Sequence, residues 1–90
     1  MHAQAEVISP PTTVLEAAHL GRGISILDLL VETGLSESKR KARDVVQGGG
    51  VSMNGERIGE VNRMVDDRDL RDGAIVLQVG KKRFHRILAK

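Results

Sequence analysis

The sequence predicts one small α+β domain, a two-helix unit followed by two antiparallel β-hairpins, with a flexible linker at its N-terminus. Two helical segments with an apolar face lie between residues 25 and 47, and a glycine follows each of them. Two pairs of β-prone segments come next, one around Asn54-Gly55 and one around Gly80-Lys81-Lys82. Ninety residues without cysteine correspond to one domain that is held together by packing rather than by disulfides.

Residues 1–24 are expected to form a largely disordered linker, and residues 25–90 the folded domain. Pro10 and Pro11 stop any helix before them, and a helical turn over residues 13–20 would be marginal in water by itself. The sequence has no signal-peptide pattern and no apolar run that could span a membrane. We therefore expect a cytoplasmic protein that does not associate with membranes.

The first helix is predicted to begin after Ser25 and to end near Thr33. Ser25 is a favourable N-cap, and Asp28 stands three residues later as in a capping box. Gly34 suits the left-handed position that ends many helices, and Leu35 supplies the hydrophobic contact that often follows.

The second helix is predicted to begin at Ser36 and to end before the glycines at 48–50. A narrow apolar stripe faces the core and consists of Leu35, Ala42, Val45 and Val46. The adjoining flank carries polar and cationic side chains that can act together: Lys39, Arg40, Arg43 and Gln47.

Each predicted hairpin has its own turn signal. Asn54-Gly55 favours a two-residue type I′ turn, because both central residues of that turn need a positive φ. Residues 59–72 are acidic and weakly patterned, so we predict a long connection that ends in the turn at Asp72-Gly73. The strands 74–79 and 83–88 then place Lys81 and Lys82 at the tip of the second hairpin.

Charge is segregated along the chain although the formal net charge is only +2. Residues 39–43 carry +4 and residues 73–90 carry +5, and neither segment contains an acid. Residues 1–38 and 44–72 carry −4 and −3. Two acid-free basic clusters on an otherwise acidic chain indicate a polyanionic partner.

The sequence predicts neither a catalytic nor a metal site. The three histidines are His2, His19 and His85, and their spacing suits neither a catalytic triad nor a metal centre. The aspartates at 66–72 lack the ligand alternation of a calcium loop, which favours a solvated turn. The glycines at 48–50 precede a strand rather than a helix, so they do not form a phosphate-binding loop.

Phe84 is the only aromatic residue, apart from histidine, and we expect it in the core. RNA binders that stack bases on aromatic rings usually present two or more such rings. The composition therefore argues against a stacking platform and for recognition of the RNA backbone and shape.

Two motifs resemble a known family. The run from Ile26 to Arg43, followed by Gln47-Gly-Gly-Gly-Val-Ser-Met-Asn-Gly55, resembles the RNA-binding domain named after ribosomal small-subunit protein four, written S-four here. The ending Gly80-Lys-Lys-Arg-Phe-His85 is similar to the close of the C-terminal domain of bacterial tyrosyl-tRNA synthetases. The resemblance covers about residues 24–90.

This resemblance implies the S-four fold with its alpha-L motif, and a domain that binds the anticodon and variable arms of tRNA, expected to be tyrosine tRNA. It implies no enzymatic activity and no cofactor for this chain, because ATP and tyrosine would bind a catalytic domain outside it. The chain would be monomeric, and the whole synthetase a homodimer through that catalytic domain. The expected RNA-binding residues are Lys39, Arg40, Arg43, Gln47, Lys81, Lys82, Arg83, His85 and Arg86.

Three alternatives remain at the level of sequence. The chain could be a stand-alone S-four protein that binds ribosomal or other structured RNA, although Ile26 replaces the arginine with which many of those proteins begin the first helix. It could be a helix-turn-helix DNA-binding domain, or an interaction domain whose basic face is only solvated.

Overall fold

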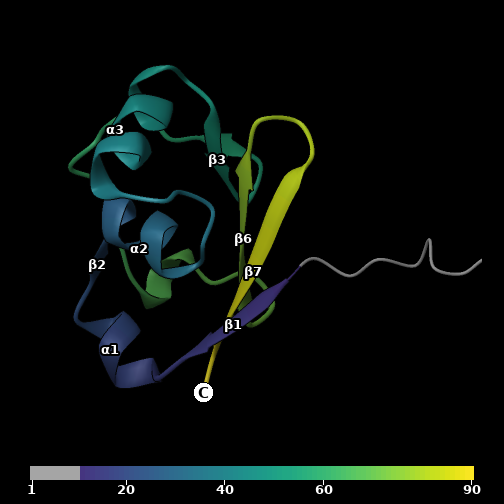
Figure 1. Ribbon diagram of the computed structural model, residues 1–90. Coiled ribbons are helices and arrows are strands. Elements are labelled where there is room, and N and C mark those ends of the chain that lie inside the picture. The colour runs from purple at the N-terminus through teal and green to yellow at the C-terminus, as the bar shows by residue number, and fades with distance from the viewer. Residues whose placement is uncertain (1–10) are drawn as a thin grey trace, which may run out of the picture.

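Within the described residues the fold has a five-stranded sheet with three helices on one side of it, and a small two-stranded sheet (Figure 1). A computed structural model describes residues 11–90. The elements are β1 (Thr12–Leu15), α1 (Ala17–Gly21), β2 (Ile24–Ser25), α2 (Ile26–Glu32), α3 (Lys39–Gln47), β3 (Val51–Met53), β4 (Glu56–Arg57), β5 (Met64–Val65), the 3-10 turn η2 (Asp67–Asp69), β6 (Ala74–Val79) and β7 (Arg83–Ala89). The predicted α+β class is confirmed.

The main sheet has the strand order β1-β7-β6-β3-β4. The two expected antiparallel pairs, β3 with β4 and β6 with β7, are both present. They do not stand apart, because β3 also pairs with β6 in antiparallel register, with Val51 opposite Val79. The core lies between this sheet and the helices, where Leu29 and Leu30 of α2 are buried in one cluster with Ile75, Leu77 and Ile87.

The expected linker over residues 1–24 is wrong for residues 12–24, which belong to the fold. β1 pairs in parallel with β7, and the N–H of Ala17 donates to the carbonyl of Lys90 at 3.1 Å. Leu15 and Leu20 are buried in the core. The partner of β1 lies about seventy residues further along the chain, so its local sequence gives no sign of the pairing. Residues 1–10 of the expected linker lie outside the described part.

Helix α3 begins two residues later than predicted. Ser38 is its N-cap and accepts the N–H of Lys41 at 3.2 Å, whereas Ser36 is buried in the preceding bend. The N–H of Ser36 donates to the carbonyl of Leu30 at 3.0 Å. This hydrogen bond caps the end of α2, where Gly34 has the expected positive φ, of 80°. It also keeps Ser36 outside the next helix.

The connection over residues 59–72 is more ordered than its sequence suggests. Met64–Val65 form β5, which pairs with β2 in a small second sheet. Asp66 caps η2, and the Asp69 carboxylate accepts hydrogen bonds from the Asp66 N–H at 2.9 Å and from Arg63 at 2.7 Å. The aspartates therefore stabilise a turn in the chain.

Phe84 is not in the core. Its relative exposure is 39%, and His85 is buried in its place at 7%. Successive side chains of a strand point to opposite faces, and Ile87 of β7 faces the helices, so His85 faces them too and Phe84 does not.

Candidate nucleic-acid interface

Helix α3 presents one of the two basic clusters. Ala42 and Val46 are buried and fix the helix against the core. The remaining face is solvent-exposed, and it carries the predicted residues together with Lys41: Lys39, Arg40, Lys41, Arg43 and Gln47. The helix ends at Gly48, and Gly49 takes a φ of 77°, so the chain turns sharply into β3. Buried side chains thus fix one side of α3, and its exposed side carries four cations and Gln47 beside one acid, Asp44.

The tip of the β6–β7 hairpin presents the second cluster. Gly80 has a φ of 68°, which lets the chain turn there, and Lys81, Lys82 and Arg83 are exposed. The N–H of Gly80 donates to the carbonyl of Gly50 at 2.9 Å. Because Gly50 follows α3 by only three residues, this bond fixes the tip beside the C-terminal end of the basic helix.

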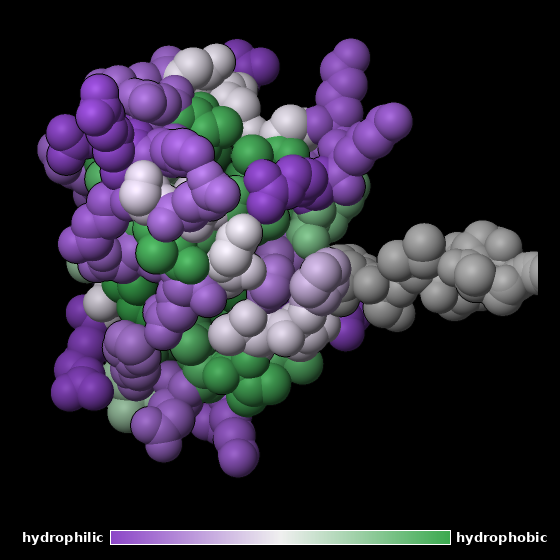
Figure 2. Space-filling view, in the orientation of Figure 1, coloured by the Kyte–Doolittle hydropathy of each residue, from purple (hydrophilic) through white to green (hydrophobic). Residues whose placement is uncertain are grey.

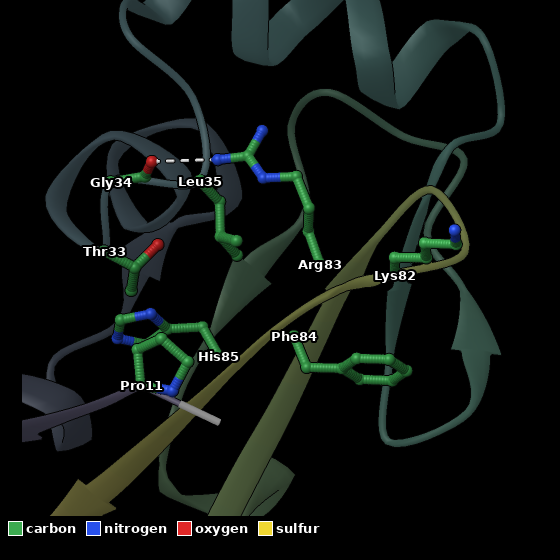
Figure 3. A pocket seen from close by; sticks show the side chains of 8 residues that line it. All are labelled: Pro11, Thr33, Gly34, Leu35, Lys82, Arg83, Phe84 and His85. Carbon is green, nitrogen blue, oxygen red and sulfur yellow. Dashed lines mark hydrogen bonds between the residues drawn. The ribbon is translucent and has the colours of Figure 1, made fainter. Parts of the chain in front are cut away.

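Arg83 connects the two clusters. Its Nη2 donates to the carbonyl of Gly34 at 3.2 Å, in the bend that leads to α3 (Figure 3). Arg83 also lines a surface hollow of about 470 Å³ together with Lys41 and Glu37. Figure 2 shows hydrophilic side chains around α3 and at the end of the β6–β7 hairpin, in the upper part of the view. The basic residues that lie 40 positions apart in the sequence thus share one end of the domain.

Two cations of α3 have acidic partners. Lys39 lies 2.8 Å from Asp28 of α2, and Lys41 pairs with Glu37. A hydrogen bond and the charge of Lys41 lower the pKa of Glu37, and the charge of Arg83 acts in the same direction. Both pairs are exposed, so they contribute little to stability and leave the cations accessible to phosphate.

The remaining cations of α3 and of the hairpin tip have no ion pair within residues 11–90: Arg40, Arg43, Lys81, Lys82 and Arg83. Their charge is therefore available to a partner. An uncompensated, exposed cation gains most from a phosphate, because no internal pair has to be broken first.

The structure does not bring two of the predicted site residues to this surface. His85 faces the helices, where its Nε2 lies 2.6 Å from Oγ1 of Thr13, and burial lowers its pKa. His85 is only 7% exposed, but it lines a surface pocket with Lys82 and Arg83, so its expected role as a hydrogen-bonding neighbour of RNA stays a prediction. Arg86 is exposed, but it follows His85 in β7 and so points to the outer face of the sheet, which no described helix covers.

Two further exposed side chains, Lys41 of α3 and Phe84 of β7, are not among the residues expected from the sequence. Lys41 belongs to the same acid-free run as its neighbours, which was sufficient to include it. The signal for Phe84 was the alternation along β7, since a buried Ile87 turns Phe84 outward.

The described chain has neither a metal-holding cluster of side chains nor a helix that could span a membrane. Residues 11–90 hold no group of three or more His, Cys, Asp or Glu side chains arranged to hold a metal ion. No helix within the same residues has the length and apolar character to cross a membrane.

Known proteins resemble this chain in sequence and in fold. The chain is 38% identical over 77 residues to a tyrosine–tRNA ligase of Acetivibrio thermocellus, and these residues are 86% of this chain and 19% of that protein. It is 39% identical over 79 residues to a tyrosine–tRNA ligase of Treponema denticola, covering 87% of this chain and 20% of that protein. The chain thus spans about a fifth of the length of these relatives.

A solution structure of a tyrosyl-tRNA synthetase C-terminal domain has the same fold. It superposes with a TM-score of 0.69 at 33% sequence identity, over 89% of this chain and 78% of that one. Residues 8–87 match the family described as the tyrosine–tRNA ligase SYY-like C-terminal domain. This match begins well before residue 25, in agreement with the place of β1 in the sheet. The chain belongs to the tyrosine–tRNA ligase SYY-like C-terminal domain family.

Proposed function

We propose that this chain binds tRNA, and that it holds the anticodon and variable arms of tyrosine tRNA for aminoacylation by a catalytic domain that lies outside the chain. The relatives named above are tyrosine–tRNA ligases, which supports tyrosine tRNA as the partner. On this proposal the chain is not itself an enzyme and needs no cofactor. ATP and tyrosine bind the catalytic domain, through which the whole ligase forms a homodimer in the cytoplasm.

One observation carries the proposal: the hydrogen bond from the Gly80 N–H to the Gly50 carbonyl, which joins the two acid-free clusters. Two basic clusters held side by side in this way can follow one RNA backbone together, which two distant patches could not. Phosphate contacts position a folded RNA without reading its bases, and the shape of the surface then selects the arms that fit it.

The proposed contacts come from both clusters. Arg40 and Arg43 of α3 bind phosphates on one strand of a stem, and Gln47 donates to a nearby phosphate or ribose oxygen. Lys81, Lys82 and Arg83 bind phosphates at the tip of the hairpin. Lys39 exchanges its exposed pair with Asp28 for a phosphate at little cost.

Charge reversal on α3 tests the proposal. The double variant Arg40→Glu/Arg43→Glu should lose most of its affinity for a tyrosine tRNA transcript. The slope of the logarithm of the binding constant against the logarithm of salt concentration should become shallower by about two. Neither residue has an ion pair within residues 11–90, so the substitutions should leave the fold intact.

A matched control is Arg22→Glu/Lys90→Glu, which changes the net charge equally at exposed positions outside α3 and outside the tip of the β6–β7 hairpin. The control should retain most of the affinity. Equal binding by the reversal variant, the control and the unchanged protein would refute the proposal. Tighter binding of duplex DNA than of tRNA at the same salt would favour a DNA-binding domain instead.

A further inference from the structure

The outer face of the sheet carries an aromatic ring between two cations. Lys82, Phe84 and Arg86 occupy every second position along and just before β7, and all three are exposed. Figure 3 shows the Phe84 ring and the Lys82 side chain on the opposite side of β7 from Arg83 and His85. We call these three residues the β7 row.

The surroundings of the ring are polar on the side of the sheet. The register places Gln78 of β6 opposite Phe84, and Ser52 of β3 opposite Gln78, on the same face. Gln78 is held by a hydrogen bond from its Nε2 to the Gly80 carbonyl at 3.0 Å. The ring is therefore 39% exposed and lies beside hydrogen-bonding groups of β6 and β3. Such a setting suits a planar polar ligand better than a purely apolar one.

The charge of the row is positive and uncompensated. Residues 73–90 contain no acid, and neither Lys82 nor Arg86 has an ion pair within the described residues. Alternate residues of a strand are about 7 Å apart. Lys82 and Arg86 therefore flank the Phe84 ring, and their side chains are long enough to reach groups bound on either side of it. Proteins that bind single-stranded nucleic acid combine an aromatic ring that stacks on a base with cations that bind the flanking phosphates.

We propose that Phe84 stacks on one unpaired nucleotide of the bound RNA, and that Lys82 and Arg86 bind the phosphates on either side of it. This inference rests on the proposed function. The hairpin tip lies between the basic clusters and the β7 row, because Arg83 points toward the α3 side and Lys82 toward the outer face (Figure 3). An RNA stem on α3 and the tip would place an adjoining unpaired nucleotide on the β7 row.

The absence of tryptophan and tyrosine from the sequence provides a direct assay. A Phe84→Trp variant has a single indole in the β7 row, and saturation with a tyrosine tRNA transcript should quench its fluorescence through stacking. A fully paired blunt RNA duplex should leave the emission unchanged, because it offers no unpaired base.

A matched control is Val14→Trp. Val14 is 54% exposed on the same face, opposite Leu88, which lies four residues or about 13 Å along β7 from Phe84. Its emission should not respond to the tRNA. Equal quenching of both indoles would indicate a non-specific effect and overturn the inference.

Affinity provides the second measurement. Phe84→Leu keeps an apolar side chain and removes the ring, so it should weaken tRNA binding about tenfold and leave duplex RNA binding unchanged. Phe84→Tyr should restore tRNA binding. Since Phe84 is already exposed, both variants should fold as the unchanged protein does, which circular dichroism checks.

The outcomes separate the two proposals. Unchanged tRNA affinity in Phe84→Leu, together with a loss in Arg40→Glu/Arg43→Glu, would refute the stacking site and keep the proposed function. Unchanged affinity in the charge-reversal variant would refute both. A blue shift of the Phe84→Trp emission on raising the protein concentration without RNA would show a contact between copies of the chain, which would also overturn the stacking site.

Discussion

Asn54 and Val76 are joined by two hydrogen bonds. The N–H of Asn54 donates to the Val76 carbonyl at 2.8 Å, and Oδ1 of Asn54 accepts the N–H of Val76 at 3.0 Å. Nδ2 of Asn54 donates in addition to the carbonyl of Asp69. Asn54 thus turns the first hairpin with a φ of 52° and also connects it to β6 and to the aspartate turn η2.

Asn54→Gly should separate these two roles. Glycine keeps the left-handed backbone of the turn but leaves the Val76 N–H without its partner, which should lower the free energy of unfolding by about 1–3 kcal/mol. Asn54→Asp keeps the acceptor for the Val76 N–H but sets a carboxylate oxygen against the Asp69 carbonyl, so it should also be less stable than the unchanged protein. Chemical denaturation of the three proteins measures the difference. Equal stability of Asn54→Gly and the unchanged protein would mean that only the turn matters.

Arg63 and Asp69 should stabilise the domain in a pH-dependent way. Burial acts to raise the pKa of Asp69, but hydrogen bonds from Arg63 and from the Asp66 N–H outweigh it and hold that pKa below 3.8. As the pH falls, Asp69 is therefore protonated in the unfolded chain before it is protonated in the folded chain. The stabilisation by the Arg63–Asp69 pair is present above pH 3.8 and is lost as the pH falls through the lower pKa of the folded state.

Arg63→Met removes the partner and leaves a partly buried carboxylate, so it should cost about 1–3 kcal/mol at pH 7 and much less at pH 2. Unfolding free energies at the two pH values test this. A cost that does not change with pH would contradict the role assigned to the pair. Arg68→Met is the control, because its side chain is 90% exposed.

His85 should make the domain less stable in mild acid. Its pKa is lowered by burial, so below the ordinary value of 6.5 the unfolded chain binds a proton that the folded chain does not. The free energy of unfolding should therefore fall between pH 7 and pH 5. His85→Gln should reduce this dependence. The same slope in His85→Gln and the unchanged protein would exclude His85 as its source.

The contact between Gly80 and Gly50 should matter for RNA binding more than for stability. Gly80→Ala has to take a left-handed backbone at a φ of 68°, which should cost about 1 kcal/mol or shift the tip. A shifted tip moves Lys81 and Lys82 away from α3, so tRNA affinity should fall. Gly80→Asn tolerates this backbone and should retain affinity. Equal affinity of both variants would show that the position of the tip is unimportant.

Local chemistry predicted the parts of the fold that depend on neighbours in sequence. Gly34, Asn54-Gly55 and Asp72-Gly73 adopt the positive φ values that their turns require, and the cationic flank of α3 follows from helical periodicity. The place of β1 was not predictable in this way, because its partner is β7 and the hydrogen bonds that hold it are backbone bonds. A four-residue segment with one buried leucine has no strong pattern of its own.

The candidate site was predicted in part for the same reason. The cations of α3 and of the hairpin tip were identified from charge alone, but their meeting depends on the pairing of β3 with β6. Residue type alone predicts a buried Phe84 and an exposed His85. Alternation along β7 puts them the other way round, because His85 shares a face with the buried Ile87. A histidine buried against Thr13 and a phenylalanine in solvent are the reverse of the usual preference.

The dependence of tRNA affinity on salt tests the central claim most directly, namely that the two clusters act together on RNA phosphates. If about five phosphates are neutralised, the logarithm of the binding constant should fall with the logarithm of salt concentration at a slope of about −4. Arg40→Glu/Arg43→Glu and Lys81→Glu/Lys82→Glu should each reduce this slope by about two. An affinity independent of salt, or a slope that reversal of either cluster leaves unchanged, would contradict the account.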